Sequence, residues 1–146
     1  FTKIEQIIIS HPDDSWNFHE EMLENCIELW NSLGIHYRVV NICTGDMGTV
    51  ASRKYDLEAW LPGPGEYKEI VSCSNCTDYQ ANRLRMRFRT PDGNSSVHTL
   101  NSTAVATSRA LVAIMEQYQL EDGRVNIPKV LQAYMNGQKI IEPTII

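Results

Sequence analysis

Apolar and polar residues follow two different periods along the chain, and these periods predict which segments are strands and which are helices. Residues 1–10 end in consecutive isoleucines after a polar–apolar alternation, which is typical of a partly buried strand. Between about 14 and 33, apolar residues recur every three to four positions, which predicts an amphipathic helix that Gly34 ends. Residues 103–119 mix apolar residues with one arginine and are predicted as a second long helix.

The remaining segments are predicted as strands and short helices separated by turn residues. The predicted strands cover residues 36–43, 54–62, 66–74, 83–89 and 96–100, and the short helices lie near 77–82 and 127–134. Proline–glycine turns between neighbouring strands favour hairpins, and hairpins make an antiparallel sheet. The predicted fold class is therefore α+β, an antiparallel β-sheet flanked by helices, in one domain that spans residues 1–146.

Composition narrows the class of protein. With 42% hydrophobic and 21% charged residues among 146, the chain has the balance of a globular domain. Its apolar runs are shorter than the roughly 18 residues that a membrane span needs, so no membrane partner is expected. The first residues have the pattern of a strand and not of a signal peptide, so we expect the chain to be part of a longer protein.

The charge distribution bears on nucleic-acid binding. The formal net charge of −5 argues against a surface wholly given to nucleic acid, but it leaves open RNA binding by a local patch. The densest basic segment contains Arg83, Arg85, Arg87 and Arg89, which alternate with apolar residues. This alternation predicts the solvated face of a strand.

The chain contains four cysteines: Cys26, Cys43, Cys73 and Cys76. Cys73 and Cys76 form a C-x-x-C pair, but neither a second pair nor a nearby histidine completes a zinc set. We interpret the cysteines as buried, reduced thiols of an intracellular protein.

Four carboxylates lie inside segments predicted as apolar strands: Glu5, Asp56, Glu58 and Glu69. A charge in a half-buried strand costs free energy unless it is paired or bound to a cation. For Asp56 and Glu58, a solvated face and a functional site are equally good interpretations. Glu69 precedes Ser72 by three positions, so a bulge would be needed to bring both side chains to one ligand. A carboxylate and a hydroxyl together would suit Mg²⁺ on a nucleotide.

Arg109 lies among small and apolar residues in the predicted second helix. There it would either form a fork onto phosphate oxygens or make a structural ion pair with a nearby carboxylate. The sequence has neither a Walker-type loop nor a G-x-G-x-x-G motif, so a bound nucleotide would not be held by a phosphate loop. His98 precedes an apolar strand end and is interpreted as structural.

Several segments together resemble the seryl-tRNA synthetases, which are class II aminoacyl-tRNA synthetases. They are FTKIEQ (1–6), KYDLEAW (54–60), EIVSCSN (69–75) and VHTLNSTAVATSRALVAI (97–114). The resemblance covers essentially the whole chain and corresponds to the C-terminal part of a catalytic domain, from the second strand of motif 2 through motif 3 and the C-terminal helix. In this family ATP is bound on an antiparallel sheet without a phosphate loop.

The resemblance implies an ATP site built from four residues of this chain. Phe1 would stack on adenine, and Glu69 and Ser72 would contact ATP and its Mg²⁺. Arg109 would hold the γ-phosphate, so Arg109 and Glu69 are the expected catalytic residues.

The resemblance also implies a serine pocket. Glu5 would bind the ammonium group of serine, and Asn101 and Thr103 would line the pocket. Hydrogen bonds to the substrate hydroxyl would then reject analogues that lack it.

The expected function is activation of serine to seryl-adenylate and its transfer to tRNA(Ser), by a homodimer in the cytoplasm or in an organellar matrix. In the family, an N-terminal arm holds the tRNA, and an arginine in the preceding strand grips the α-phosphate. Both would lie outside this sequence, so we expect the 146 residues alone to be inactive. Asn82 and Ser102 stand where the family frequently has Arg and Gly.

Two other interpretations stay open. One is a paralogue that adenylates serine for another acceptor, and the other is a non-catalytic interaction module derived from a synthetase.

Overall fold

A five-stranded antiparallel sheet forms the centre of the computed structural model, which describes residues 1–143. Its strands are β1 (Lys3–Ser10), β2 (Tyr37–Asn41), β3 (Arg53–Leu61), β4 (Glu66–Asn75) and β7 (His98–Ala106). Their order in the sheet is β1-β7-β4-β3-β2, and every neighbouring pair is antiparallel. The predicted antiparallel α+β architecture is confirmed.

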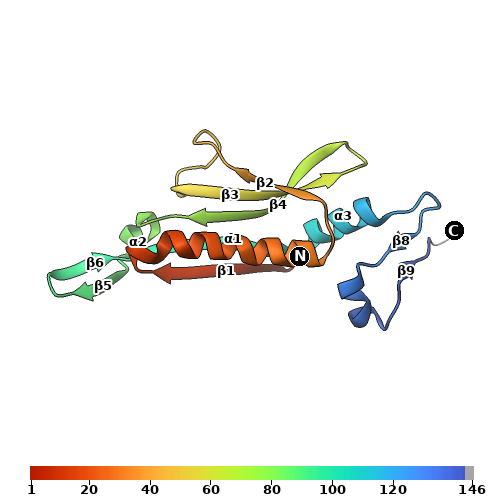
Figure 1. Cartoon of the computed structure of the whole chain (residues 1–146). Coiled ribbons are helices and arrows are strands. Elements are labelled where there is room, and N and C mark those ends of the chain that lie inside the picture. Colours follow the sequence, from red (N-terminus) through yellow and green to blue (C-terminus); the bar gives the residue numbers. More distant parts are fainter. Residues whose placement is uncertain (144–146) are drawn as a thin grey trace.

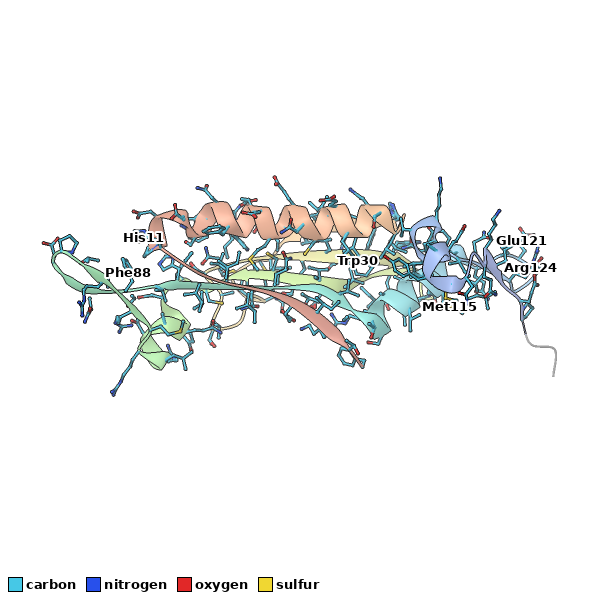
Figure 2. The ribbon with its side chains drawn as sticks, turned by 90° about the horizontal axis from the view of Figure 1, so that it is seen from below. His11, Trp30, Phe88, Met115, Glu121 and Arg124 are labelled. Atoms are coloured by element: carbon cyan, nitrogen blue, oxygen red, sulfur yellow. The ribbon has the colours of Figure 1, made fainter. Side chains whose placement is uncertain are left out.

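One long helix covers one face of this sheet (Figures 1 and 2). The helical segments are α1 (Ser15–Ser32), α2 (Tyr79–Leu84), α3 (Thr107–Tyr118) and the 3₁₀ turns η1 (Pro12–Asp14) and η2 (Lys129–Met135). Helix α1 packs against β4 and β7. It buries Met22, Cys26 and Trp30 in the core beneath it. The opposite face of the sheet, which carries Glu5, Ser72 and the other polar residues described below, is called the open face.

Two short antiparallel ribbons project from opposite ends of the sheet (Figure 1). One consists of β5 (Arg87–Thr90) and β6 (Gly93–Ser96), and the other of β8 (Val125–Asn126) and β9 (Ile140–Ile141). None of the helices in the described part of the chain combines the length and the apolar character of a bilayer-spanning segment.

Strand β4 contains a bulge beside the open face. Glu69 pairs with Glu58 of β3, and the next paired residue of β4 is Val71, so Ile70 is an extra residue in the ladder. Ile70 and Val71 are both buried on the core side. Because one extra residue shifts the alternation of side chains, Glu69 and Ser72 reach the same face. The bulge that the sequence required for a joint site is present.

A second bulge lies where β7 meets β1. Ile4 pairs with Val105 and Glu5 pairs with Thr103, so Ala104 is the extra residue. Behind this bulge, the indole Nε1 of Trp30 in α1 donates a hydrogen bond of 3.2 Å to the carbonyl oxygen of Ala104. The helix on the covered face thus supports the bulge from the side opposite the open face.

The structure corrects two predicted element boundaries. Residues 103–106, predicted as helical, belong to β7, because they pair with β1, and α3 begins only at Thr107. Pairing with a neighbouring strand outweighs the weak local helix preference of these small residues.

The structure places Arg83 in α2 and Arg85 at the left-handed end of that helix, with φ of 55°, so the predicted strand over 83–89 is wrong in its first half. The predicted C-terminal helix is the 3₁₀ segment η2.

Candidate functional site

A cavity of about 140 Å³ opens on the open face where β1 and β4 lie next to the junction of β7 and α3. Five of the seven predicted site residues line it, together with two that were not predicted. The lining residues are Phe1, Lys3, Glu69, Ser72, Thr103, Ala106 and Arg109. The structure therefore brings together side chains that are more than one hundred positions apart in the sequence.

Arg109 and Glu69 form an ion pair at one wall of this cavity. Arg109 lies in the first turn of α3, directly after β7, and its Nη1 donates to Glu69 Oε1 at 2.6 Å and to the Glu69 carbonyl oxygen at 3.0 Å. Both side chains are about half exposed, at 51% and 43%. A guanidinium has five N–H donors, and an accessible ion pair can exchange one partner for another. The site also lies at a helix N-terminus, where backbone N–H groups favour anions.

Ser72 lies opposite a buried carboxylate. Asp56 of β3 pairs with Ser72 in the sheet register and is only 4% exposed. Burial raises the pKa of Asp56, while a hydrogen bond from Ser72 and the charge of Lys54 act to lower this pKa. Lys54 Nζ lies 3.7 Å from Asp56 Oδ2, and Asp56 Oδ1 has no hydrogen-bond partner within residues 1–143. The solvated-face interpretation is wrong for Asp56.

In the sequence, Lys54, Asp56 and Glu58 alternate with apolar residues, and this pattern indicates a row of polar side chains on one face of β3, here the open face. Glu58 pairs with Arg38 Nε at 2.6 Å and is mostly buried. Sequence reasoning could not decide between a solvated face and a functional site for Asp56 and Glu58, because their surroundings depend on β2 and β4.

The oxygen atoms of Glu69 and Ser72 suit a hard divalent cation. Mg²⁺ takes oxygen ligands and usually keeps several waters or phosphate oxygens. Within the described residues, no group of three or more His, Cys, Asp or Glu side chains is arranged to hold a metal ion. The two side chains therefore fit an ion that a nucleotide would bring with it, and not an ion caged by protein alone.

Glu5 and Thr103 face each other across the bulged pair of β1 and β7. Thr103 Oγ1 donates to Glu5 Oε1 at 3.1 Å, and Lys3 Nζ contacts the same oxygen at 2.5 Å. Lys3 was missed by sequence reasoning, although its position two residues before Glu5 places it on the same face. Together these side chains form a polar corner beside the cavity.

Asn101 and Phe1 lie at the margins of the site. Asn101 shares the open face with Thr103, two positions further along β7, but it does not line the cavity and its Nδ2 donates to Cys76 Sγ at 3.6 Å. Phe1 is 88% exposed at the rim. Its ring is thus accessible to a flat ligand, and adenine stacking remains a prediction.

The cysteines and His98 have structural surroundings. Cys26, Cys73 and Cys76 are buried and free, as expected, whereas Cys43 is free but exposed. Burial raises the pKa of the Cys73 thiol to about 12. His98 Nδ1 lies 2.8 Å from Ser15 Oγ, which ties β7 to the start of α1. The structural interpretation of His98 is confirmed.

Comparisons with family models, curated proteins and solved structures all point to the same family. The family model described as "tRNA synthetase class II core domain (G, H, P, S and T)" matches residues 1–118. The serine–tRNA ligase of Methanocorpusculum labreanum is 62% identical over 140 residues, which cover 94% of this chain and 33% of that protein.

Two solved structures share the fold. The seryl-tRNA synthetase of Pyrococcus horikoshii, crystallised with ATP, superimposes with a TM-score of 0.93 at 58% identity and covers 97% of this chain and 32% of that one. The cytoplasmic serine–tRNA ligase of Naegleria fowleri, in complex with AMP, gives a TM-score of 0.89 at 49% identity over 96% of this chain and 33% of that one. The chain thus spans about a third of the length of the curated relatives it matches.

Proposed function

Because this chain belongs to the class II tRNA synthetase core-domain family, we propose that the protein that carries it activates serine with ATP and transfers the seryl group to tRNA(Ser). The observation that carries the proposal is the shared cavity of Arg109, Glu69 and Ser72 beside the Thr103–Glu5 hydrogen bond. The serine–tRNA ligases that match this chain support the choice of serine.

ATP would bind along the cavity with its phosphates toward α3. Arg109 would leave Glu69 and place its guanidinium fork on the γ-phosphate, and Phe1 would stack on adenine. Glu69 and Ser72 would hold Mg²⁺, which when bound neutralises charge on the phosphates. Glu69 and Ser72 would fit one Mg²⁺ because the β4 bulge brings both side chains to the same face of the sheet.

Serine would bind at the polar corner beside the cavity. Glu5 would accept the ammonium group, and the Thr103 hydroxyl and the Asn101 amide would contact the rest of the amino acid. A pocket built to hydrogen-bond a hydroxyl rejects an analogue without it, because its own polar groups are then left unpaired. Alanine should therefore be a poor substrate.

The chemistry would proceed in two displacements. A carboxylate oxygen of serine attacks the α-phosphorus of ATP, pyrophosphate leaves, and seryl-adenylate forms. A hydroxyl of the 3′-terminal ribose of the tRNA then attacks the acyl carbon, loses its proton, and AMP leaves. Positioning and preorganised charge supply most of the acceleration in such reactions.

Contacts to tRNA(Ser) through an N-terminal arm, homodimer formation and a cytoplasmic location belong to the same proposal. They apply to the whole protein that carries this chain.

Serine-dependent ATP–pyrophosphate exchange tests the proposal. We expect exchange by the protein that carries this chain, and a fall of about 10²-fold or more in Arg109→Ala because a preorganised charge at the reacting phosphates is lost. Arg124→Ala is the matched control, since Arg124 pairs with Asp122 outside the cavity.

Absence of exchange from folded protein would contradict the proposal and favour the non-catalytic module. Exchange without charging of tRNA(Ser) would point to another acceptor.

A further inference from the structure

Four arginines at the end of the sheet near β5 are exposed and have no carboxylate partner among residues 1–143. They are Arg83, Arg85, Arg87 and Arg89, and together they are called the arginine surface. Acidic residues outnumber basic ones in this chain, 18 to 13. Seven of the other nine basic residues make an ion pair within 4.0 Å, whereas none of these four does so within residues 1–143. The four charges are therefore available to an external anion.

Two of these guanidinium groups are held in place by uncharged contacts. Arg83 stacks over the ring of Tyr79, 3.5 Å from its centroid. Arg87 Nη1 donates to the carbonyl oxygens of Ala81 and Met86 at 3.2 and 2.8 Å. Such contacts orient a guanidinium without neutralising its charge, and they leave other N–H groups free for a ligand.

The hairpin of β5 and β6 turns two of the arginines to one side. Phe88 lies between Arg87 and Arg89 and packs on the ring of His11, with ring centroids 4.8 Å apart (Figure 2). Because side chains alternate along a strand, Arg87 and Arg89 share the face away from this aromatic contact. The Phe88–His11 contact anchors the hairpin against the end of β1.

The arginine surface continues the open face beyond the cavity. Helix α2 lies on the side of the sheet opposite α1 (Figure 2). Thr99 Oγ1 of β7 donates to Gln80 Oε1 of this helix at 2.7 Å. Thr99 and Thr103 point to the same face and are four positions apart along the strand, a distance of about 13 Å. A macromolecule that extends from the cavity along β7 toward Thr99 would reach α2.

We propose that the arginine surface binds backbone phosphates of the RNA whose 3′ end enters the cavity. This inference rests on the proposed function, which requires an RNA substrate. Guanidinium forks match phosphate geometry and are weakly hydrated, so Arg is suited to nucleic-acid backbones. Contacts of this kind position the RNA and carry no sequence information. The surface therefore sets affinity and orientation, while the identity of the RNA is read elsewhere.

The test compares RNA binding by two double variants of the protein that carries this chain. Arg85→Gln/Arg89→Gln removes two positive charges from exposed side chains that make no hydrogen bond or ion pair within residues 1–143, so folding should be unaffected. Lys129→Gln/Lys139→Gln removes the same charge from two lysines that make no ion pair within the described residues. Lys129 begins η2 and Lys139 directly precedes β9, and the β8–β9 ribbon lies at the opposite end of the molecule from β5 and β6 (Figure 1). Titrations with a tRNA(Ser) transcript over about 50 to 200 mM salt give the affinity and its salt dependence.

We expect the arginine double variant to bind the transcript about 10-fold more weakly at the lower salt concentration and to lose about two units of the log–log salt slope. Its serine-dependent pyrophosphate exchange, which needs no RNA, should stay at the wild-type level. Arg85→Lys/Arg89→Lys keeps both charges and should retain most of the affinity and slope.

Wild-type affinity and slope in the arginine double variant would overturn the inference and favour an acidic protein partner for this surface. An equal loss in the lysine control would overturn it too, because the effect would then be one of net charge. Failure of the proposed function would show separately, as absence of exchange from the wild-type protein, while the RNA titration still decides the role of the arginines.

Discussion

Glu69 and Ser72 open onto the same cavity although three positions separate them along β4. The bulge at Ile70 produces this relationship, since two side chains that are three positions apart lie on opposite faces of a regular strand. Ile70 and Val71 are buried in the core, whereas Glu69 and Ser72 on either side of them line the cavity.

Glu69→Gln should weaken productive binding of Mg²⁺ with ATP. Loss of one charge-assisted contact costs about 1.5–3 kcal/mol, or roughly 10- to 100-fold. The measurement is the Mg²⁺ concentration at half-maximal pyrophosphate exchange, which should rise for Glu69→Gln and, to a smaller extent, for Ser72→Ala. Glu66→Gln, on the same strand but paired with Lys68 and outside the cavity, should behave as wild type. An unchanged Mg²⁺ requirement in Glu69→Gln would remove this residue from the metal site.

Thr103→Val should raise the KM for serine and leave the KM for ATP near its wild-type value. The substitution keeps the shape but removes the hydroxyl that donates to Glu5, which leaves a carboxylate oxygen with one partner fewer. Loss of one hydrogen bond to a charged group costs about 1.5–3 kcal/mol, so the expected change is roughly 10- to 100-fold. Thr103→Ser restores the hydroxyl and should restore the KM. Equal effects on both substrates would indicate a general distortion of the strand.

Local periodicity predicted the elements well where each was set by its own residues. The apolar spacing of α1 and the alternation of β3 are properties of single segments, and both elements lie where the sequence predicted them. Residues 103–106 were misassigned because their strand state depends on pairing with β1, about one hundred positions away. The burial of Asp56 likewise depends on its place between β2 and β4, where it pairs with Val40 and Ser72, and alternation alone could not decide it.

The two bulges at the site could not be predicted from local sequence either. Ile70 and Ala104 resemble any other apolar residue in a strand, so the sequence revealed that a bulge was needed at Glu69 and Ser72 but not that it exists. The roles of Phe1, Asn101 and Arg109 came from resemblance to a family, and they remain predictions.

Thiol labelling should separate one cysteine from the other three. Cys43 is exposed, whereas Cys26, Cys73 and Cys76 are buried and their pKa values are raised by burial, that of Cys73 to about 12. The thiolate is the reactive form. At neutral pH a maleimide or disulfide reagent should modify one thiol of the folded chain rapidly, and Cys43→Ser should abolish this phase. A second rapid thiol in Cys43→Ser would contradict the burial of the other three.

Stability should fall on mild acidification because of His19. Its ring is fully buried, stacks on Tyr55 with centroids 5.1 Å apart, and contacts the Cys73 carbonyl oxygen through Nε2 at 3.1 Å. Burial lowers the pKa of His19 in the folded state. Below about pH 6.5 the unfolded chain takes up a proton that the folded chain does not, so the free energy of unfolding decreases as pH falls.

The urea midpoint of the wild-type chain should therefore be lower at about pH 5.5 than at about pH 7.5, and His19→Gln should show a smaller difference between the two. The variant is less stable at both values because a packed ring is lost, so the comparison concerns the pH difference alone. An identical pH difference in the variant would assign the acid sensitivity to other groups.

The ion pair between Arg109 and Glu69 has a thermodynamic consequence for ligands. Arg109 and Glu69 neutralise each other in the absence of a ligand, so a ligand that binds either side chain would have to replace this ion pair. A phosphate that binds Arg109 would leave the Glu69 carboxylate without a cationic partner. A metal ion that binds Glu69 would leave the Arg109 guanidinium without an anionic partner. Each ligand thereby lowers the cost of the other, and linkage makes this effect reciprocal. A nucleotide and its magnesium ion would therefore enter this site with positive cooperativity.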